Sequence, residues 1–214
     1  MGGGHALFVN SALFNATRID EIILPKQLES TNSIVWIKVM PKKKCDIKVI
    51  IVCGIYFKPH SKAKTLLNDH LVGNYHLLKS KYKNVRFVFT GDFNDFSPNI
   101  LLSQSGQLRQ MINYPTCGNN ALEKLVTDLH AMYQPPLKIN SLIPNSQDLG
   151  VPSDHCVNIS FPRDDISTES KRVFKTINIR PITNSQLEAM GQFLVGVRYS
   201  LIKLLKKKYK LLMM

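Results

Sequence analysis

Closely spaced cysteines are absent from this sequence. Its 214 residues contain four cysteines, at positions 45, 53, 117 and 156. None forms the paired, short spacing of a zinc site or a redox motif, and four are too few for a disulfide scaffold. These absences favour a reducing compartment.

The sequence also lacks a long hydrophobic run and a recognisable targeting signal. The first five residues, Met1-Gly2-Gly3-Gly4-His5, do not have the basic and then apolar order of a signal peptide. No uninterrupted apolar stretch approaches the twenty or so residues that cross a bilayer. We therefore expect an intracellular, soluble protein without a membrane partner.

Acidic residues are scarce relative to basic ones. Lys and Arg number 28 against 15 Asp and Glu, which gives a net charge of +13. Such a balance favours polyanionic partners, DNA or RNA among them, although a merely soluble basic surface is the alternative. Five lysines crowd the C-terminus, at positions 203, 206, 207, 208 and 210, so that about +8 is left for the rest of the chain.

Hydrophobic patterns predict alternating strands and helices. Strands are expected at residues 6–9, 33–39, 49–57, 85–89 and 157–161, and a helix at residues 65–81, where apolar positions recur near helical spacing. A further helix is expected at residues 101–111, and a short helix or strand at residues 122–133. The fold class expected from this order is α/β.

The chain is expected to divide near residue 165. Residues 1–164 would form the folded domain, and residues 165–184, which begin as a polar, charged stretch, would form a linker. Residues 185–214 open with Ser185-Gln186-Leu187-Glu188, which has the spacing of a capping box. Apolar residues then recur at helical steps as far as the lysine cluster. This predicts an amphipathic helix with a basic tail, which would fold back on the domain or bind a partner or a polyanion.

Two short segments carry most of the functional information. The first, Thr90-Gly91-Asp92-Phe93-Asn94, ends an apolar strand and, by strand alternation, would project Asp92 and Asn94 to one face. The second, Ser153-Asp154-His155, places a carboxylate beside an imidazole before another strand. Carboxylates, an amide and an imidazole can together bind a metal ion and a phosphate, which suggests hydrolysis of a phosphodiester.

Each of these residues has a proposed role in that chemistry. Asp92 would orient or deprotonate the attacking water, and Asn94 would hold the water and a phosphate oxygen. Asp154 would assist metal binding, His155 would hydrogen-bond the phosphate in the transition state, and Tyr56 would add a phenol donor. Taken singly, an Asp after a strand glycine is usually a turn residue and a strand Tyr is usually core.

The combined pattern resembles the endonuclease/exonuclease/phosphatase superfamily, and most closely the endonuclease domain of non-LTR (LINE-type) retrotransposons. The segments that carry the resemblance are 2–9, 54–59, 90–94 and 153–155. It covers roughly residues 2–162. The resemblance implies two β-sheets packed face to face with helices outside, a Mg²⁺ or Mn²⁺ cofactor, and roles for Tyr56, Asp92, Asn94, Asp154 and His155.

Two departures from the family pattern accompany the resemblance. The family opens with strands that carry an Asn and a metal-binding Glu, and this sequence begins after both, so a domain that lacks its first strands and has an incomplete metal site is expected. Glu21 and Glu29 lie in a polar connection that gives no reason for either to substitute. In addition, Glu123 stands where the family usually has the Asp that orients the histidine, and a shift on the order of 1 Å can cost about a hundredfold in rate.

The sequence therefore predicts a Mg²⁺-dependent DNA endonuclease domain of a retrotransposon-derived protein, with impaired activity. Residues 180–183 and the helix after them resemble the linker toward a reverse transcriptase, which would be a partner domain in the full element. A DNA substrate implies a nuclear location. The alternatives are a non-catalytic nucleic-acid-binding remnant of the same fold and a small-substrate phosphatase.

Overall fold

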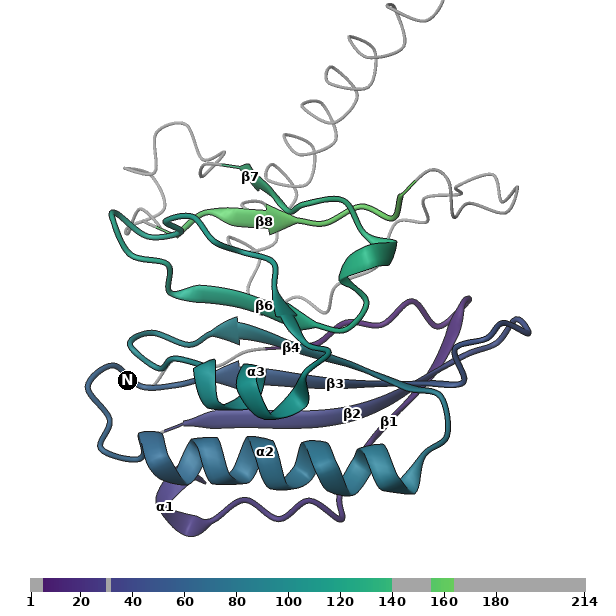
Figure 1. The fold of residues 1–214 in the computed structure, drawn as a ribbon, viewed down its shortest axis with the longest axis horizontal. Coiled ribbons are helices and arrows are strands. Elements are labelled where there is room, and N and C mark those ends of the chain that lie inside the picture. The colour runs from purple at the N-terminus through teal and green to yellow at the C-terminus, as the bar shows by residue number, and fades with distance from the viewer. Residues whose placement is uncertain (1–5, 30–31, 140–154, 164–214) are drawn as a thin grey trace, which may run out of the picture. The chain divides into compact units, whose positions relative to one another are not determined.

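The computed structural model describes residues 6–29, 32–139 and 155–163 (Figure 1). The chain forms two compact units. The first comprises Met1–Leu137 with Ile159–Ile166, and the second comprises Lys138–Asn158 with Ser167–Met214. The predicted linker at 165–184 and the predicted helix at 185–214 lie outside the described residues. Among the helices that are described, none has the length and apolar character needed to cross a membrane.

The first unit is built on a six-stranded mixed sheet with the strand order β1-β2-β3-β4-β6-β5. Only β3 and β4 are parallel, and the other neighbouring strands are antiparallel. The bounds are Phe14–Arg18 for β1, Ser33–Pro41 for β2, Val49–Tyr56 for β3, Val85–Asp92 for β4, Arg109–Gln110 for β5 and Glu123–Thr127 for β6. The helices are α1 (Lys26–Glu29), α2 (Lys64–Lys81), α3 (Asn99–Ser105) and the 3-10 turn η1 (His130–Met132).

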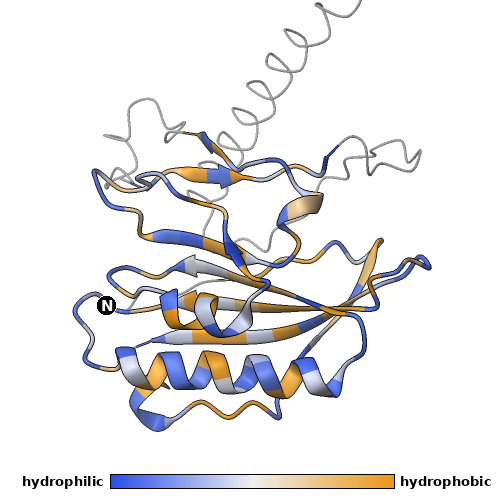
Figure 2. Ribbon diagram, viewed as in Figure 1, coloured by the Kyte–Doolittle hydropathy of each residue, from blue (hydrophilic) through white to orange (hydrophobic). Residues whose placement is uncertain are grey.

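Helix α2 connects the two parallel strands and packs its apolar stripe on one face of the sheet. Its residues Leu67, Leu71, Tyr75 and Leu78 are buried at steps of three and four residues. They join a core that the sheet supplies from alternate positions of β3 and β4, among them Ile51, Cys53, Ile55, Phe87 and Phe89. Figure 2 shows this stripe on α2 and the apolar residues of the central strands.

The other face of the same sheet is also apolar. It carries the residues that alternate with the core, including Val35, Ile37, Val52, Val88 and Leu125, which are half-buried. A sheet that is apolar on both faces is typical of a structure with a layer on each side. The α/β prediction is therefore confirmed, whereas the facing second sheet of a sandwich stays a prediction.

A small two-stranded sheet pairs β7 (Leu137–Ile139) with β8 (Val157–Ile159), and all but Leu137 and Ile159 of these residues belong to the second unit. Strand β8 corresponds to the strand predicted at residues 157–161 and ends two residues earlier than expected.

Two sequence-based expectations are wrong. Residues 6–9 form no strand, and the edge strand beside β2 is β1, in which four of five residues are exposed. The helix expected at residues 101–111 ends at Ser105, because Gly106 adopts a left-handed backbone (φ 66°) that stops it, and β5 follows. The prediction of a short helix or strand within 122–133 is confirmed by the strand β6, which the turn η1 follows.

Candidate functional site

Polar residues of three neighbouring strands line up at one end of the first sheet. Tyr56 of β3 is paired with Asp92 of β4, and Asp92 is paired in turn with Glu123 of β6. Ser33 of β2 stands opposite Tyr56 on its other side. Residues that are paired across strands point to the same face. Because Tyr56, Asp92 and Glu123 alternate with core residues, their side chains lie on the face away from α2, where all three are half-buried. We call these three residues the strand-end row.

A turn after β4, and not continued strand alternation, brings Asn94 next to this row. Strand β4 ends at Asp92, and Asn94 adopts a left-handed backbone with φ 47°. Its backbone N–H donates to Oδ1 of Asp92 at 3.0 Å. Its side-chain Nδ2 donates to the carbonyl oxygen of Phe57 at 2.7 Å. The expectation of a continuing strand is therefore corrected, since an Asx-type turn joins the two residues.

Gly91 makes this arrangement possible at the end of β4. Its φ is +136°, and a Cβ built there would overlap the carbonyl oxygen of Ile55 on the neighbouring strand. The same Cβ would lie 2.9 Å from the carbonyl carbon of Ile55 and 3.0 Å from its nitrogen. Only glycine fits such a close backbone approach.

An aromatic cluster supports the row from the core side. Phe57, Phe93 and Phe96 are almost fully buried, with ring centroids 5.4 Å apart for Phe57 and Phe96 and 6.0 Å apart for Phe93 and Phe96. The backbone N–H of Phe57 donates to the carbonyl oxygen of Asp92 at 2.9 Å, and that of Phe93 donates to Leu122 at 2.9 Å. Densely packed aromatic side chains therefore support the strand-end row.

A buried hydroxyl fixes the start of β6. Oγ1 of Thr116, a residue that is 1% exposed, accepts hydrogen bonds from the backbone N–H groups of Leu122 at 2.9 Å and Glu123 at 3.1 Å. It also donates to the carbonyl oxygen of Asn120 at 3.4 Å. Thr116 therefore determines where Glu123 enters the sheet. The sequence does not indicate this role of Thr116, because no local pattern connects Thr116 with the start of β6.

Lys124 is a second residue that the sequence pattern did not single out. Its Nζ donates to the carbonyl oxygen of Ala121 at 2.9 Å and lies 5.8 Å from the ring centroid of Phe93. Burial lowers the pKa of Lys124, while the charges of Asp92 and Glu123 act in the opposite direction. A partly buried cation near two carboxylates offsets part of their mutual repulsion.

The loop between β3 and α2 is held beside the site by Asp95. The Oδ2 atom of Asp95 lies 2.7 Å from Nζ of Lys64, and Oδ1 accepts from the backbone N–H of His60 at 3.2 Å. The hydrogen bond from Lys64 is the largest cause of the lowered pKa of Asp95. These contacts are partly exposed, so they order the loop more than they stabilise the fold.

The other predicted residues are not assigned to this row. Asp154 is outside the described residues, and His155 is half-buried in the second unit. Glu21 accepts a hydrogen bond from Lys81 at the C-terminal end of α2, which is the sheet end away from the row, and Glu29 is exposed on α1. Of the predicted set, the structure brings together Tyr56, Asp92, Asn94 and Glu123.

The row is compatible in chemical type with a divalent cation. Mg²⁺ is usually held by one or two carboxylates together with substrate phosphates and water. Asp92 and Glu123 supply two carboxylates as direct neighbours in the β4–β6 register. Within the described ranges, no three or more His, Cys, Asp or Glu side chains gather as a metal-binding group.

Comparison with known proteins gives partial structural likenesses. No protein-family model and no curated protein matches the sequence. Among solved structures, the chain is similar to the human Nocturnin catalytic domain with bound sulfate anion, at 14% identity and a TM-score of 0.47. It is also similar to an endonuclease/exonuclease/phosphatase family protein from Bacteroides thetaiotaomicron, at 14% identity and a TM-score of 0.40.

These likenesses are incomplete in both directions. They cover 71% and 66% of this chain, and they span 62% and 58% of the respective solved structures. We base the functional proposal on the residues of the site.

Proposed function

We propose that this chain is a phosphodiesterase domain whose site is suited to divalent-metal-dependent cleavage of DNA. The observation that carries the proposal is the strand-end row, in which Tyr56, Asp92 and Glu123 are direct neighbours on one face. Asn94 is attached to the same row through the hydrogen bond to Asp92. Carboxylates can bind a divalent cation and activate water, and a phenol and an amide can hydrogen-bond phosphate oxygens, which are functions that hydrolysis of a phosphodiester uses.

The roles of the residues follow from their positions. The hydrogen bond from the backbone of Asn94 to Oδ1 fixes the orientation of the Asp92 carboxylate, which we assign to orienting the attacking water. The Nδ2 group of Asn94 is bonded to Phe57, which leaves its amide oxygen to position that water. The Tyr56 hydroxyl would donate to a non-bridging phosphate oxygen.

Carboxylates of the row, together with the predicted ligand Asp154, would hold Mg²⁺ or Mn²⁺. A bound divalent cation supplies charge neutralisation at the phosphoryl oxygens. His155 is assigned to the phosphate and Glu123 to the orientation of that imidazole, as the family resemblance implies.

The finer statements about fold and origin are proposals too. The apolar second face of the sheet supports a facing second sheet, as in a sandwich, because an apolar face is stable only when covered. The motifs at residues 54–59 and 90–94 support an origin in a non-LTR retrotransposon endonuclease, with a reverse transcriptase as the partner domain. A DNA substrate would place the protein in the nucleus.

A plasmid-nicking assay with Asp92→Asn tests the proposed chemistry. The amide oxygen of the variant can still accept from the N–H of Asn94, so the turn is kept while the charge is removed. We expect slow Mg²⁺-dependent conversion of supercoiled plasmid to the open circle in the parent, and no conversion above background in Asp92→Asn. The exposed Asp69→Asn on α2 is the matched control and should nick like the parent. Equal nicking by Asp92→Asn would refute the assignment.

Nucleic-acid binding without cleavage is the second candidate. The observation that favours it is the net charge of +13, which acts on any phosphate backbone whether or not a bond is broken. In that case the parent would retain DNA in a salt-sensitive manner and would not nick more than Asp92→Asn.

A further inference from the structure

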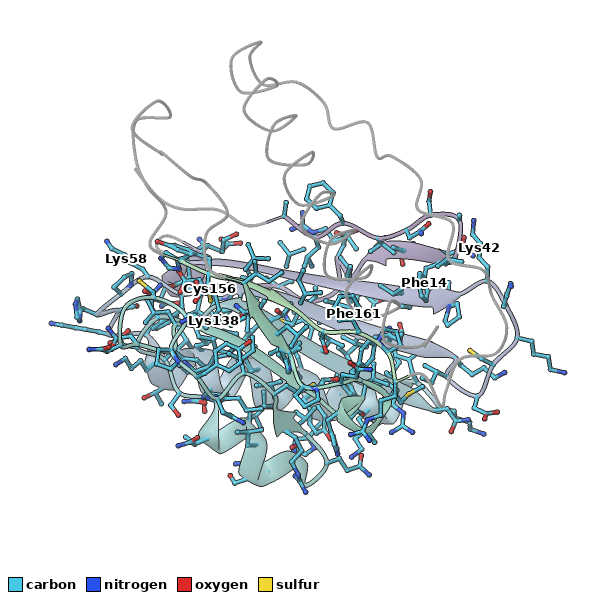
Figure 3. All side chains as sticks on the ribbon, turned by 90° about the horizontal axis from the view of Figure 1, so that it is seen from above. Phe14, Lys42, Lys58, Lys138, Cys156 and Phe161 are labelled. Atoms are coloured by element: carbon cyan, nitrogen blue, oxygen red, sulfur yellow. The ribbon has the colours of Figure 1, made fainter. Side chains whose placement is uncertain are left out.

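Basic side chains crowd the turn between β2 and β3, at the far end of the sheet from the strand-end row. Residues 42–48, which we call the lysine loop, contain Lys42, Lys43, Lys44 and Lys48 and a single acidic residue, Asp46. All five of these side chains are exposed. Figure 3 shows Lys42 and Lys58, which follows Tyr56 by two residues, at opposite ends of the sheet.

The lysine loop is ordered by its own hydrogen bonds. Nζ of Lys48 donates to the carbonyl oxygen of Cys45 at 3.0 Å, and Sγ of Cys45 donates to that of Ile47 at 3.0 Å. Nζ of Lys42 donates to the carbonyl oxygen of Ser11 at 2.6 Å and ties the loop to the residues before β1. Each ammonium group has three donors, so these bonds leave donors for a ligand.

Lys43 and Lys44 at the tip form no hydrogen bond or ion pair with the described part of the chain. Like charges that stand close together repel one another, and a polyanion relieves that repulsion. Lys83 adds a further exposed charge, because Val49 is paired with Val85 and the start of β4 therefore runs beside the end of the loop.

The distance between the lysine loop and the strand-end row makes them electrostatically separate. Strand β2 runs from Ser33, opposite Tyr56, to Pro41, directly before the loop. At about 3.3 Å per residue, its nine residues place the two ends about 26 Å apart. This is about three times the Debye length at physiological ionic strength, which is about 8 Å. A charge lost from the loop therefore has little effect on the row.

We infer that the lysine loop is a second anion-binding surface, which holds the phosphate backbone of a nucleic acid independently of the strand-end row. A nucleic acid fits better than a membrane, because membrane-binding loops combine charge with apolar anchors. In the described part of the chain, the large apolar side chains that are exposed include none from residues 42–48. Duplex DNA carries one negative charge per about 1.7 Å of its axis. Its phosphates are therefore spaced closely enough for several of them to contact the four ammonium groups of one short loop.

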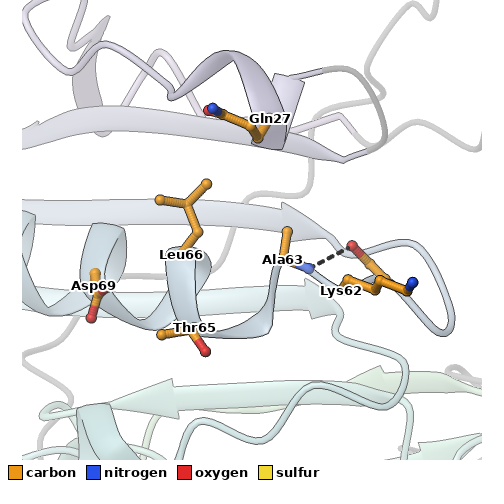
Figure 4. A pocket seen from close by; sticks show the side chains of 7 residues that line it. Gln27, Lys62, Ala63, Thr65, Leu66 and Asp69 are labelled. Atoms are coloured by element: carbon orange, nitrogen blue, oxygen red, sulfur yellow. Dashed lines mark hydrogen bonds between the residues drawn. The ribbon is translucent and has the colours of Figure 1, made fainter.

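The test measures the salt dependence of DNA binding in the whole chain. The variant K43S/K44S removes the two lysines that make no bond within the structure, so the fold should be kept. Its matched control, K26S/K62S, also lowers the net charge by two, at exposed positions whose side chains form no hydrogen bond or ion pair with the described residues. Lys62 lies at the rim of a shallow hollow of about 560 Å³ beside the first turn of α2 (Figure 4).

Fluorescence anisotropy of a labelled 20-base-pair duplex would be recorded between 50 and 300 mM NaCl with EDTA present, so that no cleavage occurs. For K43S/K44S we expect the slope of log affinity against log salt to fall by about 1.8, with at least about tenfold weaker binding at 100 mM. The control should change the slope by less than half as much. Equal changes in the two variants would show an effect of net charge alone and overturn the inference.

Two further measurements separate the remaining explanations. Vesicles that contain anionic phospholipid replace the duplex in a sedimentation assay, and a loss of vesicle binding in K43S/K44S with unchanged DNA binding would overturn the inference in favour of a membrane. The variant Asp69→Asn, at an exposed position outside both the row and the loop, should bind the duplex as the parent does. The anisotropy result does not depend on nicking, so failure of the proposed catalytic function and failure of this inference are distinguishable.

Discussion

Replacing Gly91 by alanine should be the most damaging small change at the candidate site. The added Cβ would overlap the carbonyl oxygen of Ile55 and would meet the backbone carbon and nitrogen of the same residue at 2.9 and 3.0 Å. These atoms belong to β3, a central strand that is paired on both sides, so they cannot move without disturbing two ladders.

Two energetic costs combine in Gly91→Ala. Overpacking against a fixed neighbour costs about 1–3 kcal/mol. Holding a non-glycine residue at φ +136° costs about 1–3 kcal/mol more. We expect the free energy of unfolding to fall by about 4 kcal/mol, which is a large part of the 5–15 kcal/mol or so that is typical of a domain.

Urea denaturation followed by circular dichroism measures this loss, and Gly73→Ala is its control. Gly73 lies on an exposed turn of α2, where an added Cβ meets nothing within 4 Å. Alanine there should raise the free energy of unfolding by about 0.5–1 kcal/mol, because it favours the helix. If Gly91→Ala is too unstable to purify, its soluble yield relative to that of Gly73→Ala gives the same ranking. A Gly91→Ala protein within 1 kcal/mol of the parent would refute the close approach to Ile55.

Three other predictions concern single buried groups. Nε1–H of Trp36 donates to Nε2 of His70 at 3.2 Å, and burial lowers the pKa of His70. Neutral His70 therefore stabilises the fold above the unfolded pKa of about 6.5. This contribution to the free energy of unfolding is lost as pH falls toward the lower native pKa. Unfolding midpoints at pH 7.5 and 5.5 should differ less in His70→Gln than in the parent. Thr116→Val should cost about 2–4 kcal/mol, because it leaves two backbone N–H groups without their acceptor, whereas Thr116→Ser should recover most of that in urea denaturation. Burial raises the pKa of Cys53, so iodoacetamide followed by mass spectrometry should find the exposed Cys45 modified and Cys53 spared until the chain is unfolded.

The central elements of the first unit could be predicted because their patterns are local. The helix expected at residues 65–81 is observed as Lys64–Lys81, and the strand expected at residues 49–57 is observed as Val49–Tyr56. Repeated apolar spacing within one segment determines both. Strand β1 has no such pattern, since four of its five residues are exposed. Its place at an edge depends on pairing with β2, whose partner residues lie 19 to 27 positions later.

The candidate site shows the same division. Strand alternation after Gly91 predicts that Asp92 and Asn94 are site residues on one face. In the structure they lie together for a different reason, which is the turn that Asn94 makes at φ 47°. The sequence does not indicate Thr116 or Lys124, because no local pattern marks the hydrogen bond from Glu123 to Thr116 or the contact of Lys124 with Phe93.

The amino-acid sequence alone determined which segments become the central strands and the long helix, and which residue types are available for phosphodiester chemistry. It could do so because periodicity and side-chain chemistry are properties of adjacent residues. Only the tertiary structure decided that Tyr56, Asp92 and Glu123 form one row, since strand register depends on hydrogen bonds between segments separated by about thirty residues or more. It also placed the lysine loop at the opposite end of the sheet, because the direction of β2 places its first and last residues at opposite ends.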